Sequence, residues 1–503
     1  MTRRLGDLVR GLGIQMPEAA ADVEVGGVSH DSRRVEAGDL FVALVGEHSD
    51  GRQFVSQAVE RGAVAVLGHG PAPGGLGEIP WLEAPAPRRL LGRLAARAYG
   101  DPQERLTLVG VTGTNGKSTV VALVADILDA VGRPAGVMGT LGYHFSGHRW
   151  LGTGRTTPEA SDLYRALEGM ADAGAEAVAL EVSSHALDLG RVDGLAFDVA
   201  VFTNLTRDHL DFHGDMETYF ATKRRLFKRL RDGGKVVVGI FDDWGRRLAA
   251  DLPEALTFGR DSGDVHVAAA DLTLRGTRVR IVTPRGELEI ETPLLGRYNL
   301  DNVLAAVAVA EALGLPRGAV ATGLGSTAPV PGRLERVDAG QGFPVFVDYA
   351  HTPGALEACL RSLRELTDRK LVVVFGCGGL RDRGKRPQMG RIAGELADLP
   401  VITSDNPRGE DAQAIVAEVE AGVRESGNEL YRVLPDRGEA IRRAVHLAVQ
   451  GEATGEPWLL LVAGKGHETF QDFGDRRIPF SDREQLETAI RNGQPEPVGG
   501  YRG

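Results

Sequence analysis

Apolar runs that alternate with amphipathic segments dominate the chain from residue 106 onward. Short runs rich in β-branched residues recur at 106–111 (LTLVGV), 177–182 (AVALEV), 198–203 (DVAVFT) and 235–240 (KVVVGI), with helical spacing between them. Continuous apolar runs of this length predict buried strands, and their alternation with helices predicts a mostly parallel, doubly wound sheet. The alternating residues of 265–291 predict an antiparallel excursion.

Breaks in this rhythm divide the chain. Residues 1–102 mix short strands with helices, and the αβ rhythm resumes after the stretch TAPVPG at 327–332 with FPVFVDYA, KLVVVFG, LPVITS and WLLLVAGKG. We predict an α/β protein of three domains, 1–102, 103–332 and 333–503. The central domain is expected to hold a P-loop-type, mostly parallel sheet, and the C-terminal domain to be Rossmann-like.

Composition narrows the class of protein. The 503 residues carry a formal net charge of −11, which argues against nucleic acid as a main partner. The two cysteines, Cys359 and Cys377, exclude a disulfide framework and predict a cytoplasmic protein. No uninterrupted apolar run approaches the ~20 residues of a membrane span, so none is expected.

The segment LVGVTGTNGKSTVV at 108–121 carries the clearest chemistry. A strand, a glycine-rich turn, Lys117-Ser118 and a helix form the arrangement that wraps a triphosphate. Lys117 can reach a bridging oxygen and Ser118 can ligate Mg²⁺. The spacing is unusual, because Gly110 lies one residue too far upstream for G-x-x-x-x-G-K-[ST]. The segment still predicts that the chain binds ATP or a similar nucleotide.

Further polar groups follow predicted strands. Glu181 ends a strand, where it can ligate Mg²⁺ or serve as a helix N-terminal carboxylate. The segment FTNLTRDHLDFHG at 202–214 crowds carboxylates, amides and histidines, among them His209, at a strand exit. Lys223 lies on a predicted helix beginning near Glu217, and its spacing alone favours a solvated side chain. Asn299 and Asn302 stand at a helix start, where capping is a live alternative to binding.

In the last third of the chain, polar and charged residues again follow predicted strands. Arg333 can reach phosphate oxygens, Asp348 and His351 follow a strand, and GCGGLRDRGKRP is a glycine-rich turn filled with basic residues. DNPRGED and AGKGHE also follow strands. A cleft between two α/β domains therefore suits phosphoryl transfer to a substrate that the other domain holds.

In this order, TGTNGKS, TTPE, EVSSH, FTNLTRDHLDFHG, YFATK, GRYNLDN, PGRLE, DYAHTP and AGKGHE resemble the Mur ligase family over nearly the whole chain. DSRRVEAGDLFVAL at 31–44 resembles the N-terminal uridine-diphosphate-binding domain of the member that adds the third residue of the peptidoglycan stem peptide. DNPR is the pattern of members that add meso-2,6-diaminopimelate.

The resemblance implies an ADP-forming amide ligase of peptidoglycan synthesis, with a part in cell shape and division. The D-Glu carboxylate of UDP-N-acetylmuramoyl-L-alanyl-D-glutamate would become an acyl phosphate, which the amine of the diamino acid attacks. Ser118 and Glu181 would hold one Mg²⁺. His209 and Lys223 would hold a second Mg²⁺, with Lys223 carbamylated by CO2. This role, implied by the resemblance alone, replaces the solvated side chain that the spacing of Lys223 favours. We expect a monomer.

The resemblance also implies three groups of binding residues. ATP would contact Gly113, Thr114, Asn115, Gly116, Lys117, Ser118, Thr119, Asn299, Arg333 and Asp348. The UDP-muramoyl-dipeptide would contact Ser32, His48, Ser49, Thr156, Thr157, Ser183 and Arg191. The diamino acid would contact Arg381, Asp405, Asn406, Arg408, Gly464 and Glu468.

Two positions depart from the family pattern. Leu380 stands where diaminopimelate-adding relatives carry Asp, which leaves L-lysine and L-ornithine as alternatives, and Leu189 replaces a Gln found in some members. Folylpolyglutamate synthetase shares the phosphate loop, but would not carry DSRRVEAGDLFVAL or DNPR. A catalytically silent nucleotide-binding scaffold is the alternative from another class, although Lys117, Glu181, His209 and Lys223 are all present.

Overall fold

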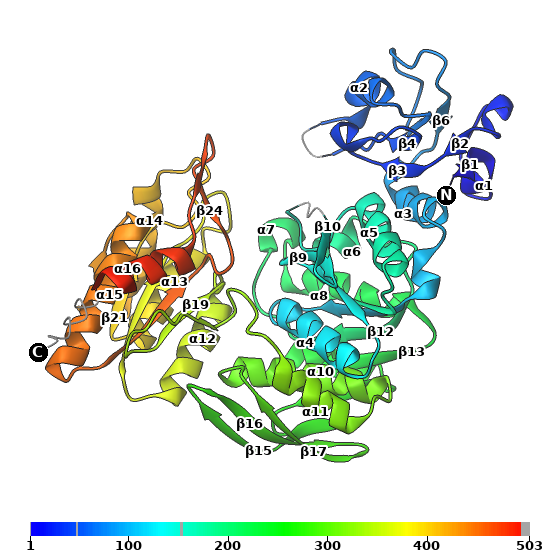
Figure 1. Ribbon diagram of the computed structural model, residues 1–503. Coiled ribbons are helices and arrows are strands. Elements are labelled where there is room, and N and C mark those ends of the chain that lie inside the picture. The colour runs from blue at the N-terminus through cyan, green and yellow to red at the C-terminus, as the bar shows by residue number, and fades with distance from the viewer. Residues whose placement is uncertain (1, 47–48, 151–153, 494–503) are drawn as a thin grey trace, which may run out of the picture.

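The computed structural model describes residues 2–46, 49–150 and 154–493, and it has three α/β units (Figure 1). The N-terminal unit contains a four-stranded parallel sheet in the order β3-β4-β5-β6. These strands are β3 (Gly27–Ser29), β4 (Asp39–Val42), β5 (Ala65–Gly68) and β6 (Trp81–Glu83). The short pair β1 (Arg3–Arg4) and β2 (Glu24–Val25) and the helices α1 (Leu5–Val9), α2 (Val55–Glu60) and α3 (Pro87–Ala98) complete the unit.

The central unit is built on an eleven-stranded mixed sheet. Its parallel core has the order β8-β11-β7-β12-β13-β14. The strands of this core are β7 (Thr107–Thr112), β8 (Ala135–Gly139), β11 (Ala177–Glu181), β12 (Phe197–Phe202), β13 (Leu230–Gly239) and β14 (Leu256–Gly259). β11 is buried along its whole length, as its continuous apolar sequence predicts for a strand covered on both faces. The predicted mostly parallel, doubly wound sheet is confirmed.

Both edges of this sheet are antiparallel. One edge is formed by β15 (Val265–Thr273), β16 (Gly276–Thr283) and β17 (Gly286–Thr292), where the sequence predicts an excursion: β15 is parallel to β14, and these three strands are antiparallel to one another in turn. The other edge is a hairpin of β9 (Gly142–Phe145) and β10 (His148–Trp150), which the sequence analysis missed. The turn residues Ser146 and Gly147 have φ of 47° and 78°, the positive values that a tight two-residue hairpin requires.

Helices cover both faces of the central sheet (Figure 1). One face packs against α4 (Lys117–Ala130), α10 (Arg297–Ala312) and α11 (Arg317–Ser326). The other carries α5 (Ala160–Asp172), α6 (Ser184–Asp188), α8 (Met216–Arg224) and α9 (Asp243–Asp251), and the short α7 (Leu210–His213) contacts α8. The core on this second face continues into the N-terminal unit, because α3 packs against α5.

The C-terminal unit contains a six-stranded sheet in the order β18-β19-β23-β20-β21-β22, parallel except for β18. Its strands are β18 (Glu335–Arg336), β19 (Val345–Asp348), β20 (Lys370–Phe375), β21 (Leu399–Ile402), β22 (Arg432–Val433) and β23 (Trp458–Ala463). The helices are α12 (Pro353–Leu366), α13 (Lys385–Leu396), α14 (Ala412–Glu425), α15 (Arg437–Thr454) and α16 (Asp482–Gly493), and β24 (Phe470–Asp472) and β25 (Arg477–Pro479) form a hairpin. No helix in the described ranges is long and apolar enough to cross a membrane.

Strand order brings the motifs together. β11, β7 and β12 are neighbours, so the phosphate loop, Ser183 and Asn204 leave the central sheet at the same edge. β19, β23, β20 and β21 are likewise neighbours in the C-terminal sheet, so the segments after Asp348, Ala463, Phe375 and Ile402 share one edge. The carboxyl edge of a parallel sheet is where such folds bind ligands.

Candidate active site

The phosphate loop runs from Gly113 to Gly116 between β7 and α4. Both glycines have positive φ, of 147° and 87°. A Cβ on Gly113 would lie 1.9 Å from Thr203 Oγ1, and a Cβ on Gly116 would lie 2.3 Å from Asn302 Oδ1. Larger residues would therefore clash at both positions. The bare backbone and the start of α4 leave amide groups available for phosphate oxygens.

Lys117, the first residue of α4, folds back over this loop. Its Nζ donates hydrogen bonds to Gly113 O at 2.9 Å and to Thr114 O at 2.8 Å. Burial lowers the pKa of its ammonium group. The neighbouring Ser118 Oγ accepts a hydrogen bond from Arg333 Nη2 at 3.2 Å. Arg333 follows the central unit in the chain, so the phosphate loop is contacted from the side of the C-terminal unit.

The remaining predicted loop residues hold the loop in shape. The Asn115 amide donates to Asn204 Oδ1 at 3.0 Å, and Thr114 Oγ1 donates to Thr206 O at 3.2 Å. Thr119 is buried in the first turn of α4. The segment at 202–214 therefore fixes the conformation of the phosphate loop as well as facing the site.

Glu181 lies at the end of β11, 1% exposed. Its Oε1 accepts the Thr140 backbone N–H at 2.8 Å, and its Oε2 lies 3.3 Å from Thr140 Oγ1. A buried carboxylate and the Ser118 hydroxyl are hard oxygen donors of the kind that Mg²⁺ takes, together with phosphate oxygens and water. In the described part of the chain, no three His, Cys, Asp or Glu side chains converge as a metal cluster would require.

Lys223 is buried, which corrects the solvated side chain that its spacing favours. α8 begins at Met216, and the lysine faces inward with 1% exposure. Its Nζ donates to Gly113 O at 2.8 Å and lies 4.5 Å from the centre of the Tyr219 ring. Burial, and then the charge of Lys117, lowers the pKa of Lys223 well below its ordinary value.

Histidines gather beside this lysine. The rings of His185 and His209 meet edge to face with centroids 4.8 Å apart. His209 has a φ of 54°, an uncommon left-handed backbone conformation, at the N-cap of α7. Burial lowers the pKa values of both histidines to about 4, so both imidazoles are neutral near pH 7 and can act as metal ligands.

Asn299 and Asn302 do not cap α10, because Gly296 holds the N-cap position and no side chain caps the helix there. Asn299 Nδ2 donates to Leu295 O at 2.9 Å, and its Oδ1 accepts from Asn302 Nδ2 at 3.1 Å. Both side chains are buried. The pair thus places the Asn302 oxygen against the phosphate loop, and the capping alternative is wrong.

Asp348 ends β19 and is engaged on both oxygens. Oδ2 accepts from Tyr298 OH at 3.0 Å and from the Leu334 N–H at 2.6 Å, and Oδ1 accepts from the Ala350 N–H at 2.8 Å. These bonds tie the linker that carries Arg333 to the C-terminal sheet. The next residue, Tyr349, lies under Arg333, whose guanidinium carbon is 4.8 Å from the ring centre.

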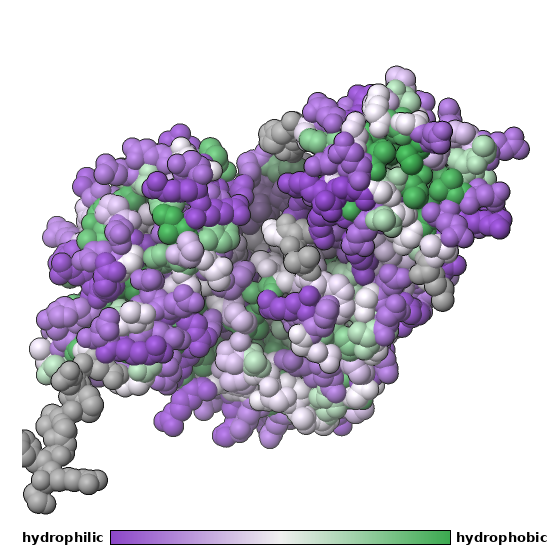
Figure 2. Space-filling model, turned by 45° about the horizontal axis from the view of Figure 1, so that its top comes forward, coloured by the Kyte–Doolittle hydropathy of each residue, from purple (hydrophilic) through white to green (hydrophobic). Residues whose placement is uncertain are grey.

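A cavity of 310 Å³ lies between the central and C-terminal units, where Figure 2 shows the surface hollowed. The central unit contributes histidine, threonine and aspartate side chains, and the C-terminal unit contributes its four strand-end segments. The lining residues are Thr156, His185, Asp208, His209, Asp211, Tyr349, His351, Gly378, Arg381, Asp382, Lys385, Asp405, Asn406, Arg408, Gly464 and Glu468. All six residues predicted for the diamino acid are among them.

A buried lysine organises the C-terminal wall of this cavity. Lys465 Nζ donates to Asn406 Oδ1 at 3.0 Å and to Glu468 Oε2 at 2.9 Å, and it lies 3.7 Å from Asp405 Oδ1. Arg408 has a φ of 51° and donates to Gly379 O at 3.3 Å. The wall therefore presents carboxylates and a guanidinium side by side, as a ligand with ammonium and carboxylate groups requires.

A second cavity, of 420 Å³, lies at the N-terminal unit. Ser32, Ser49 and Gln57 line it, and Ser32 Oγ donates to Gln57 Oε1 at 2.7 Å. His48, predicted for the same ligand, lies outside the described residues.

The other residues predicted for this ligand lie toward the centre. Thr156 lines the 310 Å³ cavity, Thr157 Oγ1 donates to Glu181 O at 2.7 Å, and Ser183 Oγ caps α6 by accepting the Ala186 N–H. Arg191 Nη1 donates to Thr157 O at 3.2 Å. Of this predicted set, Ser32 and Ser49 therefore line one cavity and Thr156 lines the other, whereas Thr157, Ser183 and Arg191 are not among the lining residues of either.

Several contributing residues escaped the sequence analysis. Thr140, just after β8, donates its backbone N–H to Glu181, and the ring of Tyr349 packs against the guanidinium of Arg333. Glu159 forms ion pairs with three arginines beside the N-terminal cavity. Thr140 directly follows β8, which is the neighbour of β11 in the sheet, so its contact with Glu181 could be predicted only from the strand order. Tyr349 lies in the motif DYAHTP and Glu159 in the motif TTPE, but the predicted binding residues of these motifs are their neighbours Asp348, Thr156 and Thr157.

The sequence is similar to those of known proteins. Three family models match consecutive parts of the chain: "Mur ligase family, catalytic domain" at residues 24–99, "Mur ligase middle domain" at 111–310 and "Mur ligase, glutamate ligase domain" at 332–466.

Similar proteins match nearly the full length. A UDP-N-acetylmuramoyl-L-alanyl-D-glutamate–2,6-diaminopimelate ligase of Geobacter metallireducens is 44% identical over 97% of this chain and 98% of its own. The protein of that name from Solibacter usitatus is also 44% identical, over 95% and 96%. A solved structure of a ligase of the same name is 33% identical, with a TM-score of 0.67 over 98% of this chain and 99% of that one.

Proposed function

This chain belongs to the Mur ligase family, and we propose that it joins 2,6-diaminopimelate to UDP-N-acetylmuramoyl-L-alanyl-D-glutamate at the expense of ATP. The observation that carries the proposal is the 310 Å³ cavity, on which His209 of the central unit and Arg408 and Glu468 of the C-terminal unit converge. A reaction that activates one substrate on the first unit and binds an amino acid on the second requires that arrangement.

A carboxylate must be activated before an amine can attack it. The D-Glu carboxylate would attack the γ-phosphorus of ATP, and ADP would leave with its electron pair on the bridging oxygen. Lys117, the loop amides and Arg333 would meet the charge of the transferring phosphoryl group, since all three lie at the phosphate loop. The diamino acid's amine would then attack the acyl phosphate, and phosphate would leave as the amide forms.

Ser118 and Glu181 would hold Mg²⁺, because they offer hard oxygen donors beside the loop. The ion would neutralise phosphate charge during the transfer. Asn299 and Asp348 would contact the nucleoside end of ATP, with Asn302 as a neighbour that the geometry adds.

Lys223 would act as a carbamate. Only the neutral amine of lysine attacks CO2, and burial lowers the pKa of Lys223 well below its ordinary value. Its position 2.8 Å from Gly113 O places it under the phosphate loop. Carbamylation would convert this nitrogen into an anionic oxygen ligand, beside the neutral His209, for a second cation.

In the C-terminal unit, Arg408 would bind the distal carboxylate of diaminopimelate and Glu468 its ammonium group. Arg381, Asp405, Asn406 and Gly464 line the same cavity. Leu380 is 64% exposed and is not among the lining residues, so its departure from the family's Asp leaves this wall of the cavity unchanged.

We further propose domain boundaries at 1–102, 103–332 and 333–503, since each of the three main sheets forms from one of these ranges. A monomer is proposed because a single chain supplies both cavities. A cytoplasmic site of action follows from ATP as a substrate and from the free, buried Cys359 and Cys377.

The test is ligation with Mg-ATP and the UDP-muramoyl-dipeptide, offering meso-diaminopimelate, L-lysine and L-ornithine in separate reactions and measuring product by mass. Product with meso-diaminopimelate alone is the expected result. Product with lysine or ornithine instead would overturn the choice of amino acid and keep the ligase. Failure with all three, from protein that still binds ATP, would favour the silent scaffold.

A further inference from the structure

Three arginines meet at one carboxylate beside the 420 Å³ cavity. Glu159 stands at the N-cap of α5 and is 4% exposed. Its Oε1 accepts from Arg155 Nη1 at 2.9 Å and from Arg191 Nε at 3.1 Å, and its Oε2 accepts from Arg88 Nη1 at 3.1 Å. Arg88 belongs to α3 of the N-terminal unit, whereas the other two arginines belong to the central unit.

The charges in this cluster do not balance. Three guanidinium groups face one carboxylate, which leaves two positive charges, and no second carboxylate in the described part of the chain lies within ion-pair distance of these arginines. Arg33, also at this cavity, is neutralised by Asp31 at 2.8 Å. Burial lowers the pKa of Arg191; Glu159 opposes this shift, and the charges of Arg155 and Arg88 add to it.

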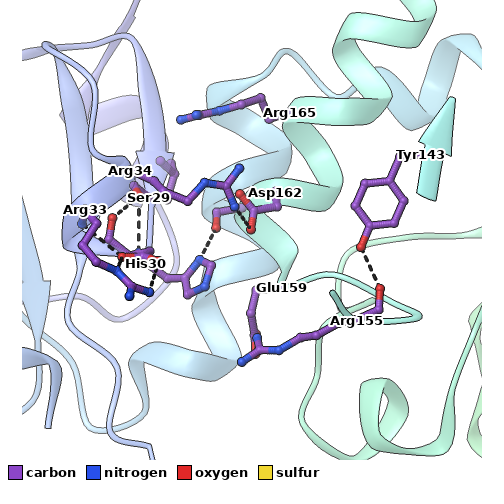
Figure 3. A network of polar contacts seen from close by, with 12 residues as sticks. Ser29, His30, Arg33, Arg34, Tyr143, Arg155, Glu159, Asp162 and Arg165 are labelled. Carbon is purple, nitrogen blue, oxygen red and sulfur yellow. Dashed lines mark hydrogen bonds and ion pairs between the residues drawn. The ribbon is translucent and has the colours of Figure 1, made fainter. Parts of the chain in front are cut away.

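A ligand in the cavity can reach these positively charged groups. Arg88, Arg155 and Glu159 line it together with Ser32, Ser49 and residues of the N-terminal sheet. Figure 3 shows Arg155 and Glu159 on the central unit and His30 and Arg33 on the N-terminal unit, and all four line the cavity. The N-terminus of the 13-residue α5 adds positive potential at the same place. An anion that enters here meets charge from both units.

We propose that Arg88 and Arg155, held in place by Glu159, bind the diphosphate of the nucleotide-sugar substrate and so join the N-terminal unit to the central unit. The proposal rests on the proposed function. A diphosphate diester carries two negative charges, the number that the cluster leaves uncompensated, and guanidinium groups bind phosphate oxygens in pairs. The uridine would then lie toward Ser32 and Ser49, and the muramoyl-dipeptide would extend toward Thr156.

The same interface supplies a matched control. Arg34 Nη1 pairs with Asp162 at 2.9 Å across the two units, and Figure 3 shows this pair beside the cluster. Arg34 is not among the residues that line the cavity. Arg34→Gln therefore removes one arginine and one ion pair from the interface while leaving the proposed diphosphate contacts intact.

The experiment compares full-length wild-type protein with Arg88→Gln, Arg155→Gln and Arg34→Gln. Calorimetry measures the Kd of the UDP-muramoyl-dipeptide at low and high salt, and competition measures the Ki of UDP and of uridine. The KM for ATP is measured alongside. Arg88→Gln and Arg155→Gln should each weaken UDP-muramoyl-dipeptide and UDP about tenfold to a hundredfold, as loss of a charged hydrogen bond implies, and should flatten the salt dependence.

Uridine inhibition and the KM for ATP should stay within about twofold in these variants, and Arg34→Gln should leave all the constants near wild type. Equal weakening of UDP and uridine would overturn the proposal, because it would indicate a distorted cavity. Unchanged binding of UDP in Arg88→Gln and Arg155→Gln would overturn it as well. Wild-type protein that binds neither UDP nor the UDP-muramoyl-dipeptide would instead overturn the proposed function itself.

Discussion

At the scale of single residues, burial decides the chemistry of the site. Lys117 and Lys223 both donate to the carbonyl of Gly113, and burial lowers the pKa values of both. The charge of Lys117 lowers the pKa of Lys223 further. An exposed position on a helix would leave Lys223 an ordinary ammonium group, whereas burial lowers its pKa, as the proposed reaction with CO2 requires.

Lys223→Ala should lower kcat about a hundredfold or more, the size of effect expected when a group that stabilises transferring charge is removed. Wild-type protein in ¹³C-bicarbonate should show a carbamate carbon resonance, and the variant should lack it. Lys228→Ala, which changes an exposed lysine just beyond α8, is the control and should keep both activity and resonance. Full activity in Lys223→Ala would contradict the carbamate.

Leu380 offers a test of backbone strain. It has a φ of 51°, where a side chain with a Cβ is disfavoured, and it is 64% exposed. Leu380→Gly should raise the free energy of unfolding by about 0.5–1 kcal/mol, because relief of strain exceeds the added entropy of the unfolded chain. Urea titration measures this change.

The control for Leu380 is Leu430→Gly at a position that is 67% exposed and has no positive φ. This variant should lower the free energy of unfolding by about 0.5–1 kcal/mol, through the unfolded state alone. A loss of stability in both variants would show that Leu380 is not strained.

At the scale of elements, the site lies at the ends of neighbouring strands, and a buried ion pair stabilises the segments that follow two of these strands, β21 and β23. Arg437, the first residue of α15, pairs with Asp482, the first residue of α16, at 2.7 Å. It also donates to Ala463 O at 2.9 Å and to Ser404 O at 3.4 Å. These carbonyls directly precede Gly464 and Asp405, so the pair braces both segments of the C-terminal wall.

Arg437→Met should lower the free energy of unfolding by about 3–5 kcal/mol, because it leaves the Asp482 carboxylate buried without a partner. The matched change is Arg443→Met on the same helix, whose exposed pair with Glu439 should matter by less than about 1 kcal/mol. Urea midpoints of the two variants give the comparison. Similar midpoints would mean that the buried pair contributes no more than an exposed one.

At the scale of the whole molecule, three units meet so that two cavities open between or beside them (Figures 1 and 2). Several neutral histidines line the cavity between the central and C-terminal units. Burial lowers the pKa values of His185, His209 and His351 to about 4. Protonation of these imidazoles is therefore less favourable in the folded chain than in the unfolded chain.

Stability should consequently fall with pH between about 6.5 and 4. In this range the unfolded chain binds protons that the folded histidines do not, so acidification favours unfolding. His351→Gln should reduce the slope of the urea midpoint against pH in this window, while His148→Gln, at an exposed position, should leave it unchanged. An unaltered slope in His351→Gln would show that this histidine takes up its proton without unfolding.

The sequence by itself determined the class of the fold and the identity of the motifs, because both rest on local signals. Hydrophobic runs specify the strands of the parallel core, and Gly113–Thr119 specifies a phosphate loop whatever surrounds it. The resemblance then named the reaction, which full-length relatives support. The site roles of individual residues remain predictions.

Only the tertiary structure decided the environment of each group. The burial of Lys223, the place of Asn302 over the phosphate loop and the contact of Thr140 with Glu181 depend on which strands and helices become neighbours. The convergence of Arg88, Arg155 and Arg191 on Glu159 joins residues up to 103 positions apart in the chain (191 − 88). Desolvation and charge pairing act through space, so no local pattern in the sequence records them.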